Sequence, residues 1–470
     1  MPETMTATRN HRLRAVQPRR TTPGWWRDAC GLVAGGSLLV VVALWVQNRG
    51  VQLLSTGPAG LLTTTGRLTG LLAADLLLVQ VVLMARIPFV ERSYGQDELA
   101  RRHRLVGFTS FNLMVAHIVL IALGYAASDR KGVVREVWDL VWTYPGMLLA
   151  TAGTAALVMV VVTSVRLARA RLRYESWHLL HLYAYLGVGL ALPHQLWTGA
   201  DFLASPAATV YWWGAYIAAA GSVVVFRAGL PLWRTLWHRP VVSAVVPEAA
   251  GVISVHISGR RLRRLPLRAG QFFVWRFLDG PGWTRGHPYS LSAAPSPDGL
   301  RITVKDLGDG SRRIAELRPG TRVALEGPYG RLTADSRTRP KVTMLASGIG
   351  VTPLRALLEE LPYAPGEATL VYRAGREADF LFRAELAALA ARRGVRIFYV
   401  PGHRVIGRES WMPHRAAALS DEEGLLQLVP DLRDHDVFVC GPDAWIDAAV
   451  AAAHGAGVPA AQVHVERFGW

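Results

Sequence analysis

The sequence predicts a membrane α-helical bundle of six transmembrane helices, followed by a small β-barrel domain and an α/β domain with a parallel sheet. Six long apolar runs with very few charged residues occupy the first half of the chain. Short strand-like runs begin near residue 240, and strand and helix patterns alternate after residue 340. The hydrophobic fraction, 51% of 470 residues, is too high for an ordinary soluble enzyme of this length.

Each apolar run is close to the roughly twenty residues that a helix needs to cross a bilayer. The first run follows a basic lead, residues 1–28, and is long enough to span, so we expect a retained helix and no cleaved signal peptide. Together the runs predict a six-helix transmembrane domain over residues 29–229. They are residues 29–47, 68–85, 105–127, 146–165, 177–198 and 205–226.

Basic residues concentrate in every second connection between these runs. By the positive-inside rule these connections are cytoplasmic, and so are both ends of the chain. The net charge of +17 predicts contact with the inner leaflet of the bilayer, because no nucleic-acid-binding motif accompanies it. The rich connections carry Arg9, Arg12, Arg14, Arg19, Arg20 and Arg27, then Arg86, Arg92, Arg101, Arg102 and Arg104, then Arg166, Arg169, Arg171 and Arg173.

Tryptophans near the ends of the runs predict an aromatic belt at the two membrane interfaces. Tryptophans in the core of a bundle would give the same pattern. The residues are Trp26, Trp45, Trp142, Trp177, Trp197 and Trp212.

The chain has two cysteines, Cys30 and Cys440. Two cysteines exclude a disulfide framework, a four-cysteine zinc site and an iron–sulfur cluster within this chain. A redox metal would therefore need histidine ligands.

Four histidines in the third and fifth runs are spaced so that they can form two pairs. His103 and His117 are fourteen residues apart, and His181 and His194 are thirteen apart. At about 1.5 Å of rise per residue, each spacing separates two imidazoles by roughly 20 Å along a helix. If the two helices run in the same direction, His103 faces His181 and His117 faces His194, and a haem fits between each pair. One intramembrane histidine is more often a packing residue, but four at matched spacing favour metal ligands.

The spacing of thirteen requires a distortion of the fifth helix. At about 100° per residue, thirteen residues turn a side chain roughly 140° from its starting face, whereas fourteen return it within roughly 40°. Pro193 directly precedes the last histidine, with Gly187 and Gly189 a turn earlier, and a proline kinks a helix. His178 is a rival ligand that could instead contact a haem propionate. We prefer His181 because it keeps both pairs in step.

From about residue 240 the chain changes to strands, first in a β-barrel domain over residues 240–335 and then in an α/β domain over residues 340–470. Turn residues separate the strands. We expect strands at 241–246, 252–258, 271–277, 341–347, 368–373, 396–400 and 436–440, with helices starting near 353 and 380.

The segment 287-HPYSLSAAP-295 has the residues of a flat aromatic surface with short polar groups. Pro288 keeps the chain extended, Tyr289 offers an apolar ring with a hydroxyl, and Ser290 and Ser292 offer hydrogen-bonding side chains. Such a surface, which begins at His287, suits a flavin ring and its ribityl chain. Alone, it could equally be an ordinary strand with a turn.

The next strand, in 302-ITVKDLGDGS-311, ends in a glycine-rich turn that carries Lys305, Gly310 and Ser311. Backbone amides and these side chains can bind a pyrophosphate. Because Gly-Asp-Gly is a common turn, this segment supports FAD only together with the motif before it.

The segment 348-GIGVTP-353 follows an expected strand and precedes an expected helix, which is the setting that a phosphate-binding glycine loop requires. Gly348 and Gly350 allow the backbone to approach a phosphate. The helix start at Thr352 and Pro353 supplies unpaired amides and the positive end of a dipole.

A dinucleotide site usually has an acidic residue at the end of the next strand, where it binds the ribose 2′-hydroxyl. This chain has Arg373 at that position and Arg376 nearby, which favours NADPH over NADH. The alternative is that both are solvated surface arginines.

The segment 440-CGP-442 ends a later strand at the same edge of the sheet, where the ligand cleft of such a domain lies. We therefore expect Cys440, Gly441 and Pro442 near the nicotinamide, although Cys440 could be a buried structural cysteine. Trp470 ends the chain and could stack on an exposed flavin face or belong to a core.

These motifs resemble those of the transmembrane ferric reductase and NADPH oxidase superfamily, whose members join a six-helix, two-haem domain to a ferredoxin-reductase-like module. The histidine pairs are similar to the family's haem ligands, and residues 287–295, 348–353 and 440–442 look like its flavin, NADPH and nicotinamide-side motifs. The likeness covers nearly all of the chain after the basic lead. His287 stands where soluble relatives usually have arginine, which places the chain nearer the oxidase branch.

The resemblance implies electron transfer from cytoplasmic NADPH through FAD and two b-type haems to an external acceptor, either oxygen or a ferric chelate. Ser290, Cys440 and Trp470 would lie at the reacting rings, and Trp470 would move aside for the nicotinamide. Because two histidines fill the axial positions of each iron, the acceptor would be reduced at the haem edge.

The resemblance also concerns the outer end of the bundle. Oxidases of this family have an arginine at the outer end of the second helix, here Arg67, and commonly a second histidine one turn beyond the outer ligand, where this chain has Ile121. Arg67 could attract oxygen or superoxide, but we expect it to neutralise a haem propionate.

Two other interpretations stay open. The flavin module could pass electrons to another membrane component, with the helices as a docking domain, or the chain could be a non-catalytic haem-binding scaffold or sensor. The flavin and nicotinamide motifs argue against the last class, because a scaffold does not need them.

Overall fold

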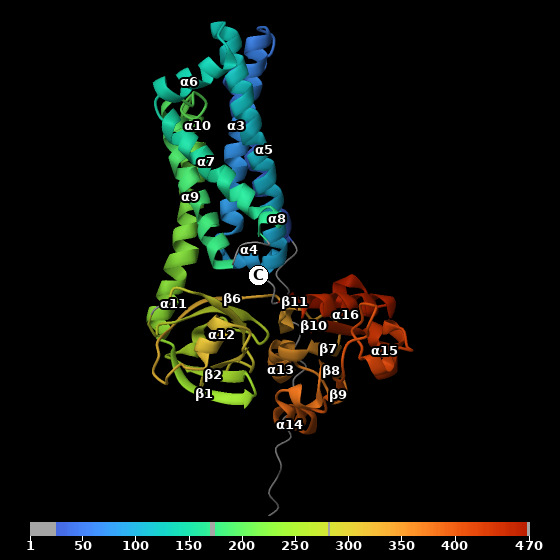
Figure 1. Cartoon of the computed structure of the whole chain (residues 1–470). Coiled ribbons are helices and arrows are strands. Elements are labelled where there is room, and N and C mark those ends of the chain that lie inside the picture. Colours follow the sequence, from blue (N-terminus) through green and yellow to red (C-terminus); the bar gives the residue numbers. More distant parts are fainter. Residues whose placement is uncertain (1–24, 170–173, 281–282, 468–470) are drawn as a thin grey trace, which may run out of the picture. The chain divides into compact units, whose positions relative to one another are not determined.

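The computed structural model describes residues 25–169, 174–280 and 283–467 (Figure 1). The predictions for Trp470 and for most of the basic lead lie outside these ranges. The chain divides after Ala228 into two compact units. We call them the helical unit, which starts at Trp25, and the sheet unit, which starts at Gly229 and contains the strands.

Several helices of the helical unit begin at a proline, which has no N–H to leave unpaired and whose φ suits a first helical turn. This holds for α3, α4 and α10. The helices are α1 (Trp25–Gln47), α2 (Gly50–Leu53), α3 (Pro58–Leu83), α4 (Pro88–Tyr94), α5 (Gln96–Asp129), α6 (Val133–Thr143), α7 (Met147–Ser164), α8 (Arg166–Arg169), α9 (Tyr174–Trp197) and α10 (Pro206–Ser222), with a π-helical segment at Val223–Gly229.

The prediction of several membrane helices is confirmed. The expected fifth span is α9, which has 24 residues but contains three histidines, whose polar rings lower its mean hydropathy. The count of six therefore stays a prediction. In the described chain, the helices that are long and apolar enough to cross a membrane are Trp25–Gln47, Pro58–Leu83, Glu98–Asp129, Met147–Ser164 and Pro206–His238.

Helix α3 packs along α5, and α7 packs along α9 (Figure 1). A β-carbon on Gly66 would lie 3.0 Å from the Ile121 side chain, and one on Gly153 would lie 2.7 Å from the Gly187 carbonyl oxygen. Small residues at such contacts are typical of membrane helix pairs, because they let the backbones approach. Gly187 thus has a packing role, and α9 continues as a helix through Pro193.

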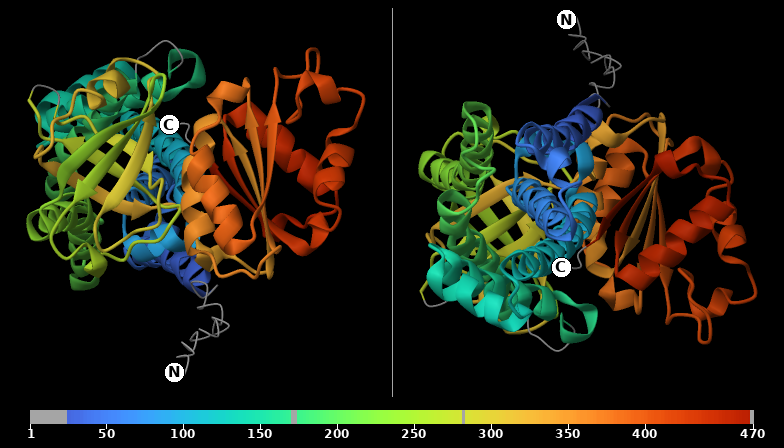
Figure 2. Two further views of the ribbon diagram at one scale, coloured as in Figure 1. Left: turned by 90° about the horizontal axis from the view of Figure 1, so that it is seen from below. Right: turned by 90° about the horizontal axis from the view of Figure 1, so that it is seen from above.

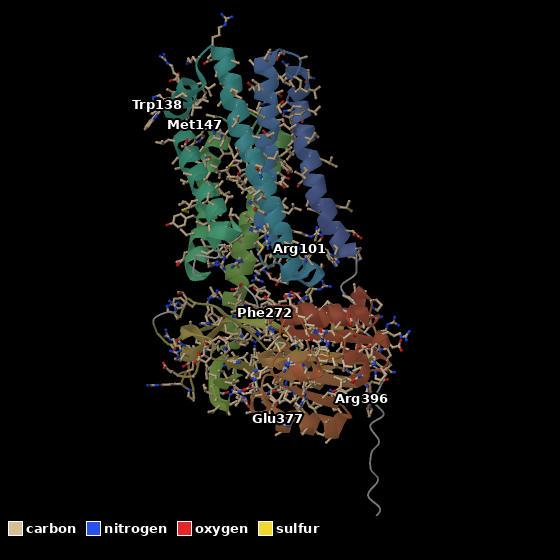
Figure 3. All side chains as sticks on the ribbon, turned by 45° about the vertical axis from the view of Figure 1, so that its right-hand side comes forward. Arg101, Trp138, Met147, Phe272, Glu377 and Arg396 are labelled. Atoms are coloured by element: carbon tan, nitrogen blue, oxygen red, sulfur yellow. The ribbon has the colours of Figure 1, made fainter. Side chains whose placement is uncertain are left out.

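Helix α6 connects α5 to α7. It has 11 residues, too few to cross a bilayer, and was not predicted from the sequence. Glu136 and Leu140 are buried, whereas Val134, Trp138 and Trp142 are 87%, 65% and 59% exposed. Figure 3 shows Trp138 projecting away from the helices. An amphipathic helix between two spans is typical of a segment that lies in the membrane interface.

Two of the tryptophans expected in an interfacial belt are core residues instead. Trp45 and Trp212 are buried. The indole N–H of Trp45 donates to the Thr64 carbonyl at 3.1 Å, and Trp212 stacks on Phe202 with ring centroids 4.1 Å apart. Because both rings find their partners inside the unit, the belt prediction is wrong for these two residues.

The first part of the sheet unit has two three-stranded antiparallel sheets, with strand orders β1-β2-β5 and β4-β3-β6. Both line one apolar core, in which Trp275 is fully buried. Isolated bridges from Val241 to Arg322 and from Leu291 to Ile302 connect the two sheets. The elements are α11 (Leu230–His238), β1 (Val241–Ala249), β2 (Val252–Ser258), β3 (Phe272–Phe277), β4 (His287–Ser290), β5 (Leu300–Lys305), α12 (Asp309–Ile314) and β6 (Val323–Tyr329).

The second part is a five-stranded parallel sheet with helices on both faces (Figure 2). Met344 and Leu370 face the core shared with α13 and α14, and Leu345 and Val371 face the core shared with α15 and α16. The strand order is β11-β10-β7-β8-β9, so the chain changes direction across the sheet between β7 and β10. The elements are β7 (Lys341–Ser347), α13 (Val351–Glu360), β8 (Ala368–Ala374), α14 (Arg383–Arg393), β9 (Arg396–Pro401), α15 (Asp421–Leu428), β10 (His435–Gly441), α16 (Asp443–Gly455) and β11 (Val463–Arg467).

Candidate functional site

The structure brings the four histidines of the helical unit together as two pairs. The rings of His103 on α5 and His181 on α9 have centroids 6.0 Å apart, and those of His117 and His194 are 6.5 Å apart. The first histidine of α5 thus faces the first of the pair on α9, and the second faces the second. His178, one turn before His181, is not the residue opposite His103.

Each of the four histidines has a polar partner at Nδ1. A metal-binding histidine commonly uses one ring nitrogen for such a hydrogen bond, which fixes the ring and leaves Nε2 for the metal. The partners are the Gln80 carbonyl for His103 at 3.2 Å, the Gly66 carbonyl for His117 at 2.8 Å, the Ser164 hydroxyl for His181 at 3.3 Å and the Thr198 hydroxyl for His194 at 2.7 Å.

The donor set fits two axial ligands for a haem iron. Two imidazoles that bind one metal at about 2 Å each place their ring centroids roughly 6 Å apart, close to the separation in both pairs. Over residues 25–169, 174–280 and 283–467, no group of three or more His, Cys, Asp or Glu side chains could hold a metal ion. A porphyrin would supply the remaining four ligands.

Glycines make room for the ligands of the second pair. A β-carbon on Gly70 would lie 2.5 Å from Nδ1 of His117, and one on Gly146 would lie 2.7 Å from the backbone nitrogen of His194. Gly146 also has a φ of +80°, which favours glycine. The backbones of α3 and of the segment before α7 therefore lie directly against the two histidines.

Arg67 is engaged by an acidic partner inside the helical unit. Its Nε donates to the Asp201 carboxylate at 2.7 Å, a second guanidinium nitrogen lies 2.5 Å from the other oxygen, and the Asn48 amide donates to the same carboxylate at 2.6 Å. The charge of Arg67 is thus balanced by Asp201, which the sequence reasoning missed. The arrangement fixes α3 to the connection between α9 and α10.

In the sheet unit, the predicted flavin segment forms β4 and is held by β3. Tyr289 pairs with Phe273 across the strands, and the indole N–H of Trp275 donates to the Tyr289 carbonyl at 3.0 Å. His287 and Tyr289 stack on the same side of β4 with centroids 6.1 Å apart. Burial raises the pKa of Tyr289 to about 12, so its hydroxyl stays protonated. Burial and the nearby Arg285 lower the pKa of His287, which favours its neutral form.

The two serines of this segment have different surroundings. The Ser290 hydroxyl is buried and has no hydrogen-bond partner among the residues that the structure describes, which is the state expected of a side chain that contacts a cofactor. The Ser292 hydroxyl, by contrast, accepts from Thr303 at 2.8 Å and from Arg301 at 3.1 Å. Ser290 thus fits a flavin contact better than Ser292 does.

The glycine-rich turn lies beside the start of β4. A β-carbon on Gly310 would lie 3.3 Å from the His287 ring. The Ser311 hydroxyl donates to the Gly308 carbonyl at 2.8 Å, and Lys305 is exposed at the end of β5. The segment predicted for the pyrophosphate therefore adjoins the segment predicted for the flavin ring.

The glycine loop and the Cys440 segment meet at the switch point of the parallel sheet. Gly348 and Gly350 form a short helical turn after β7, with Thr352 and Pro353 in the first turn of α13. A β-carbon on Gly350 would lie 2.2 Å from the Cys440 carbonyl oxygen. The carboxyl ends of strands at a switch point are where such sheets bind nucleotides.

Cys440 itself is inaccessible. Its side chain is fully buried, and burial, together with Glu466, raises the pKa of the thiol. A β-carbon on Gly441 would lie 2.9 Å from the Ser347 side chain, and Pro442 precedes α16. Cys440 therefore acts as a neutral thiol in the sheet, and its backbone is the part closest to the glycine loop.

Arg373 ends β8 in register with Ser347, at the same edge of the sheet. It is 4% exposed, and its Nε has no hydrogen-bond partner. Burial lowers its pKa to about 10, and the positive charges of Arg404 and Arg415 add to this effect. Three arginines thus gather at this edge, whereas Arg376 is exposed and paired with Asp379 at 3.0 Å.

Two family models match the chain. Residues 69–192 match the ferric reductase like transmembrane component, a range that contains three of the paired histidines and ends just before His194. Residues 344–451 match the oxidoreductase NAD-binding domain, which contains the glycine loop and Cys440. The two matches fall in the helical unit and in the parallel sheet.

Among curated relatives, the ferredoxin–NADP reductase B of Sorangium cellulosum is 35% identical over 213 residues, which cover 43% of this chain and 84% of the relative. Together, the matches combine a ferric reductase like transmembrane component with an oxidoreductase NAD-binding domain, as in a ferric reductase or NADPH oxidase-like protein with a ferredoxin-reductase-type module. An NADPH oxidoreductase of Mycobacterium tuberculosis is 30% identical over 247 residues, or 51% of this chain and 62% of the relative. The chain thus spans about three fifths of the length of this relative.

A solved structure, the FAD/NAD-binding domain of a nitric oxide dioxygenase from Vibrio cholerae, is 23% identical, with a TM-score of 0.39 and 50% of this chain and 99% of that chain covered. By the two family models, the chain is a membrane protein that joins a ferric-reductase-like transmembrane component to an oxidoreductase NAD-binding domain.

The site residues that sequence reasoning missed lie in connections between helices and strands. Arg404 and Arg415 belong to the long segment between β9 and α15, and Asp201 follows α9. The basic composition of residues 403–415 was a signal that Arg404 and Arg415 could belong to an anion-binding site. Asp201 gave none, because an acidic residue in a connection between membrane helices is common.

Proposed function

We propose that the chain moves electrons from NADPH through FAD and two b-type haems to an acceptor on the other side of the bilayer. The observation that carries the proposal is the pairing of His103 with His181 and of His117 with His194 at separations suited to one iron each. When bound, FAD accepts a hydride and releases single electrons, which the haem irons relay. The residues of the chain bind, orient and shield these groups.

The two pairs define an inner and an outer haem site. His103 and His117 are roughly 20 Å apart along α5 at about 1.5 Å per residue, and α9 carries its two ligands in the same order. The basic start of α5 is cytoplasmic under the positive-inside rule, and so are both ends of the chain. The site of His103 and His181 is then the inner one.

The proposed architecture has six membrane helices, with α9 as the fifth. Its lower hydropathy comes from the histidines themselves, so the residues that make it functional also make it less apolar. The two antiparallel sheets form a closed barrel for the flavin, which the bridges at both edges support. The domains are those expected from the sequence: 29–229 for haem, 240–335 for FAD and 340–470 for NADPH.

The flavin site is formed by β4 and the glycine-rich turn. His287 and Tyr289 present neutral rings on one side of the strand, and the free hydroxyl of Ser290 can donate to the flavin ring. The turn that carries Gly310 binds the pyrophosphate, and the Ser311 amide stabilises this turn by donating to the Gly308 carbonyl at 3.1 Å. A neutral His287 adds no fixed charge beside the flavin, which distinguishes it from an arginine at the same place.

The nicotinamide nucleotide binds across the ends of β7 and β10. The backbone of Gly348 and Gly350 receives the pyrophosphate at the start of α13. Arg373, together with Arg404 and Arg415, supplies positive charge for the 2′-phosphate, which supports NADPH over NADH. Three neighbouring arginines repel one another, and binding of the doubly charged 2′-phosphate offsets this repulsion.

His117 and His194 would hold the outer haem with two protein ligands, so the haem would supply electrons to an acceptor that does not itself bind the iron. Oxygen and a ferric chelate both suit this arrangement. Arg67 forms an ion pair with Asp201, so it contributes little free positive charge for attracting superoxide. We propose that its main role is to fix the outer end of α3.

Proteoliposomes test the proposal directly. They contain the full chain with the NADPH site facing outward and enclose a membrane-impermeant ferric chelate. Added NADPH should reduce the enclosed chelate. If NADPH reduces the flavin but the chelate reacts only after another membrane fraction is added, the chain serves a membrane partner and the proposal is wrong.

His194→Ala provides the variant for this assay. It should stop reduction of the enclosed chelate and leave flavin reduction by NADPH intact. The matched control is His454→Ala, because His454 is exposed on α16 and belongs to neither pair. Equal loss in both variants would contradict the assignment of His194.

A further inference from the structure

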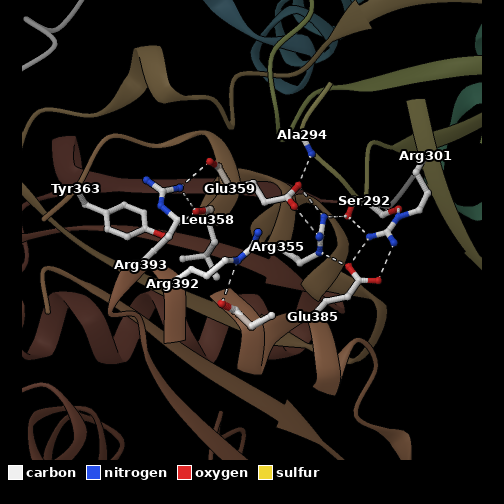
Figure 4. Close-up of polar contacts among 11 residues, drawn as sticks. Ser292, Ala294, Arg301, Arg355, Leu358, Glu359, Tyr363, Glu385, Arg392 and Arg393 are labelled. Atoms are coloured by element: carbon white, nitrogen blue, oxygen red, sulfur yellow. Dashed lines mark hydrogen bonds and ion pairs between the residues drawn. The ribbon is translucent and has the colours of Figure 1, made fainter. Parts of the chain in front are cut away.

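Helix α13 connects the nucleotide loop to the flavin half of the sheet unit (Figure 4). Its first turn follows the glycine loop, and its last turns hold backbone groups of the flavin half. The Glu359 carboxylate accepts from the Ala294 amide at 2.7 Å, and the Glu360 carboxylate accepts from the Ala269 amide at 2.9 Å. One short helix therefore has one end at the nucleotide site and the other end bound to the flavin domain.

Arg355 is the centre of this contact. Its side chain is 7% exposed and forms an ion pair with Glu359, one turn further along α13, at 2.7 Å. It also donates to the Ser292 carbonyl at 3.0 Å and contacts Glu385 on α14 at 2.7 Å. Ser292 comes two residues after the end of β4.

Glu385 receives a second arginine from the flavin half. Arg301 on β5 donates to both of its carboxylate oxygens, at 2.8 and 3.0 Å. The same guanidinium donates to the Ser292 hydroxyl and to the Ser292 carbonyl, at 3.1 and 2.9 Å. Figure 4 shows both arginines converging on Glu385 and Ser292. The bidentate pair fixes orientation as well as distance.

The charges of this cluster depend on one another. Burial alone would raise the pKa of Glu385, but its hydrogen bond to Arg301 and the charge of Arg355 lower the pKa below its usual value. The groups that face Glu385 are Arg301 on β5, Arg355 on α13 and, more distantly, His256 on β2. Without Glu385, the largely buried Arg301 loses the carboxylate it pairs with, and Arg355 keeps only its ion pair with Glu359. Because an uncompensated buried charge is costly, removal of Glu385 affects both halves.

We propose that Arg301, Glu385 and Arg355 form a positioning clamp that holds the flavin strand in register with the nucleotide loop. The inference rests on the proposed hydride transfer from NADPH to FAD. Hydride transfer requires the two rings to be close and aligned, and a misplacement of about 1 Å can slow such a step by about a hundredfold. The clamp acts at both reacting partners: Ser292 follows the flavin strand, and α13 follows the glycine loop.

The test is Glu385→Gln in the full-length protein, with flavin reduction by NADPH followed under anaerobic single-turnover conditions. Glutamine keeps the shape of the side chain but loses the charge. We expect the limiting rate of flavin reduction to fall by about ten- to a hundredfold, while FAD content and the dissociation constant for NADPH stay unchanged. The absorbance of the complex between reduced flavin and NADP+ should fall in parallel, because it depends on ring overlap.

A double-mutant cycle separates a clamp from simple loss of structure. Arg301→Met combined with Glu385→Gln should be no slower than the worse single variant, because both remove the same contact. The matched control is Asp447→Asn, which removes an exposed ion pair with Arg467 from α16 and β11 and should leave the rate unchanged. If Glu385→Gln fails to bind FAD, Arg355→Lys provides a second variant for the same measurement.

The possible outcomes separate this inference from the proposed function. If the unmodified protein shows no flavin reduction by NADPH, the proposed function is wrong. If it does, and Glu385→Gln and Arg355→Lys reduce flavin at the unmodified rate, the clamp is wrong. A variant that loses only affinity for NADPH, with an unchanged limiting rate, would also overturn the positioning role.

Discussion

In the helical unit, the candidate ligands come from two helices and keep their sequence order in space: His103 and His117 on α5 face His181 and His194 on α9. In the sheet unit, the corresponding groups come from the ends of strands that are far apart in the sequence, such as β7, β8 and β10. The first arrangement depends on helical spacing. The second depends on strand order, which local spacing does not encode.

The two units also differ in how they fix their functional side chains. Each histidine has a hydrogen-bond partner at Nδ1, and glycines on neighbouring segments let the backbone approach His117 and His194. The arginines and Glu385 of the sheet unit are held by several charged contacts at once. A change in one unit should therefore leave the cofactors of the other unit unaffected.

The largest expected effect is that of Gly350→Ala in the sheet unit. The new β-carbon would lie 2.2 Å from the Cys440 carbonyl oxygen, and a backbone group cannot move aside easily. Flavin reduction by NADPH should fall by about a hundredfold or more, as expected for a displaced nucleotide loop. The haem spectrum after chemical reduction should not change. Gly375→Ala is the control, because its β-carbon would meet nothing closer than 3.5 Å.

Gly70→Ala makes the reciprocal change in the helical unit. Its β-carbon would lie 2.5 Å from Nδ1 of His117, so the ring must turn away from the Gly66 carbonyl. We expect loss of one of two haems and normal flavin reduction by NADPH, measured as haem per protein and as stopped-flow rate. Gly189→Ala has open space around its β-carbon and should behave like the unmodified protein. Loss of haem in both variants would show that packing in general, and not contact with His117, is responsible.

The arginines at the end of β8 should have a smaller effect. Arg404→Ala and Arg415→Ala should each raise the KM for NADPH by about tenfold, the factor that corresponds to about 1.4 kcal/mol. The KM for NADH should change little, because NADH lacks the 2′-phosphate. Arg408→Ala is the control from the same segment, since Arg408 contacts Asp421 and Leu419. A parallel change for both nucleotides would contradict the phosphate role.

Asp75 in α3 is a buried polar residue that belongs to neither histidine pair. Its removal tests whether a buried polar group of the helical unit can contribute to stability without affecting haem binding. Its carboxylate accepts from Ser37 at 2.9 Å and from Tyr211 at 2.5 Å. Asp75→Leu removes an acceptor from both hydroxyls, which keep only the Ala34 carbonyl at 2.9 Å for Ser37 and the Ser37 carbonyl at 3.3 Å for Tyr211. Loss of each hydrogen bond costs about 1 kcal/mol. The thermal midpoint should fall with both haems retained, and Tyr211→Phe in the same chain should restore part of it. Asp139→Asn, on the exposed side of α6, should have little effect.

The smallest effect is a pH dependence from Cys440. Its pKa is raised in the folded chain, so the folded state holds the proton more strongly than the unfolded state. Stability should therefore decrease as the pH rises above the usual thiol range, and this decrease should be absent in Cys440→Ala. The measurement is thermal unfolding in a Cys30→Ser background. Rapid labelling of Cys440 by a maleimide without unfolding would contradict its burial.

Much of the fold could be predicted from the sequence, because strong local patterns decide it. β2 and β7 begin and end at the predicted residues, and α13 starts two residues before the predicted position. Apolar length predicts membrane helices well. Helix α6 was missed because it is amphipathic and short, and Trp45 was misplaced because burial depends on which helix packs against it.

Residues of the candidate site could be predicted where their spacing within a helix or a loop is itself the signal. The four histidines and the glycine loop belong to this class. The clamp was not predictable, because Arg301, Arg355 and Glu385 meet only after β5, α13 and α14 have packed. Ser292 was assigned to the flavin for the same reason: spacing reveals that it is polar, but not that Arg301 and Thr303 occupy its hydroxyl.

The central claim is that four histidines hold two haems at two depths. The most direct measurement is the haem content of the purified full-length protein, combined with electron paramagnetic resonance of the oxidised state. The account predicts two haems per chain, both low-spin with two histidine ligands, and one haem in each of His117→Ala and His181→Ala, whereas His178→Ala keeps both. A chain without haem, or with a high-spin iron that has one histidine ligand, would contradict it.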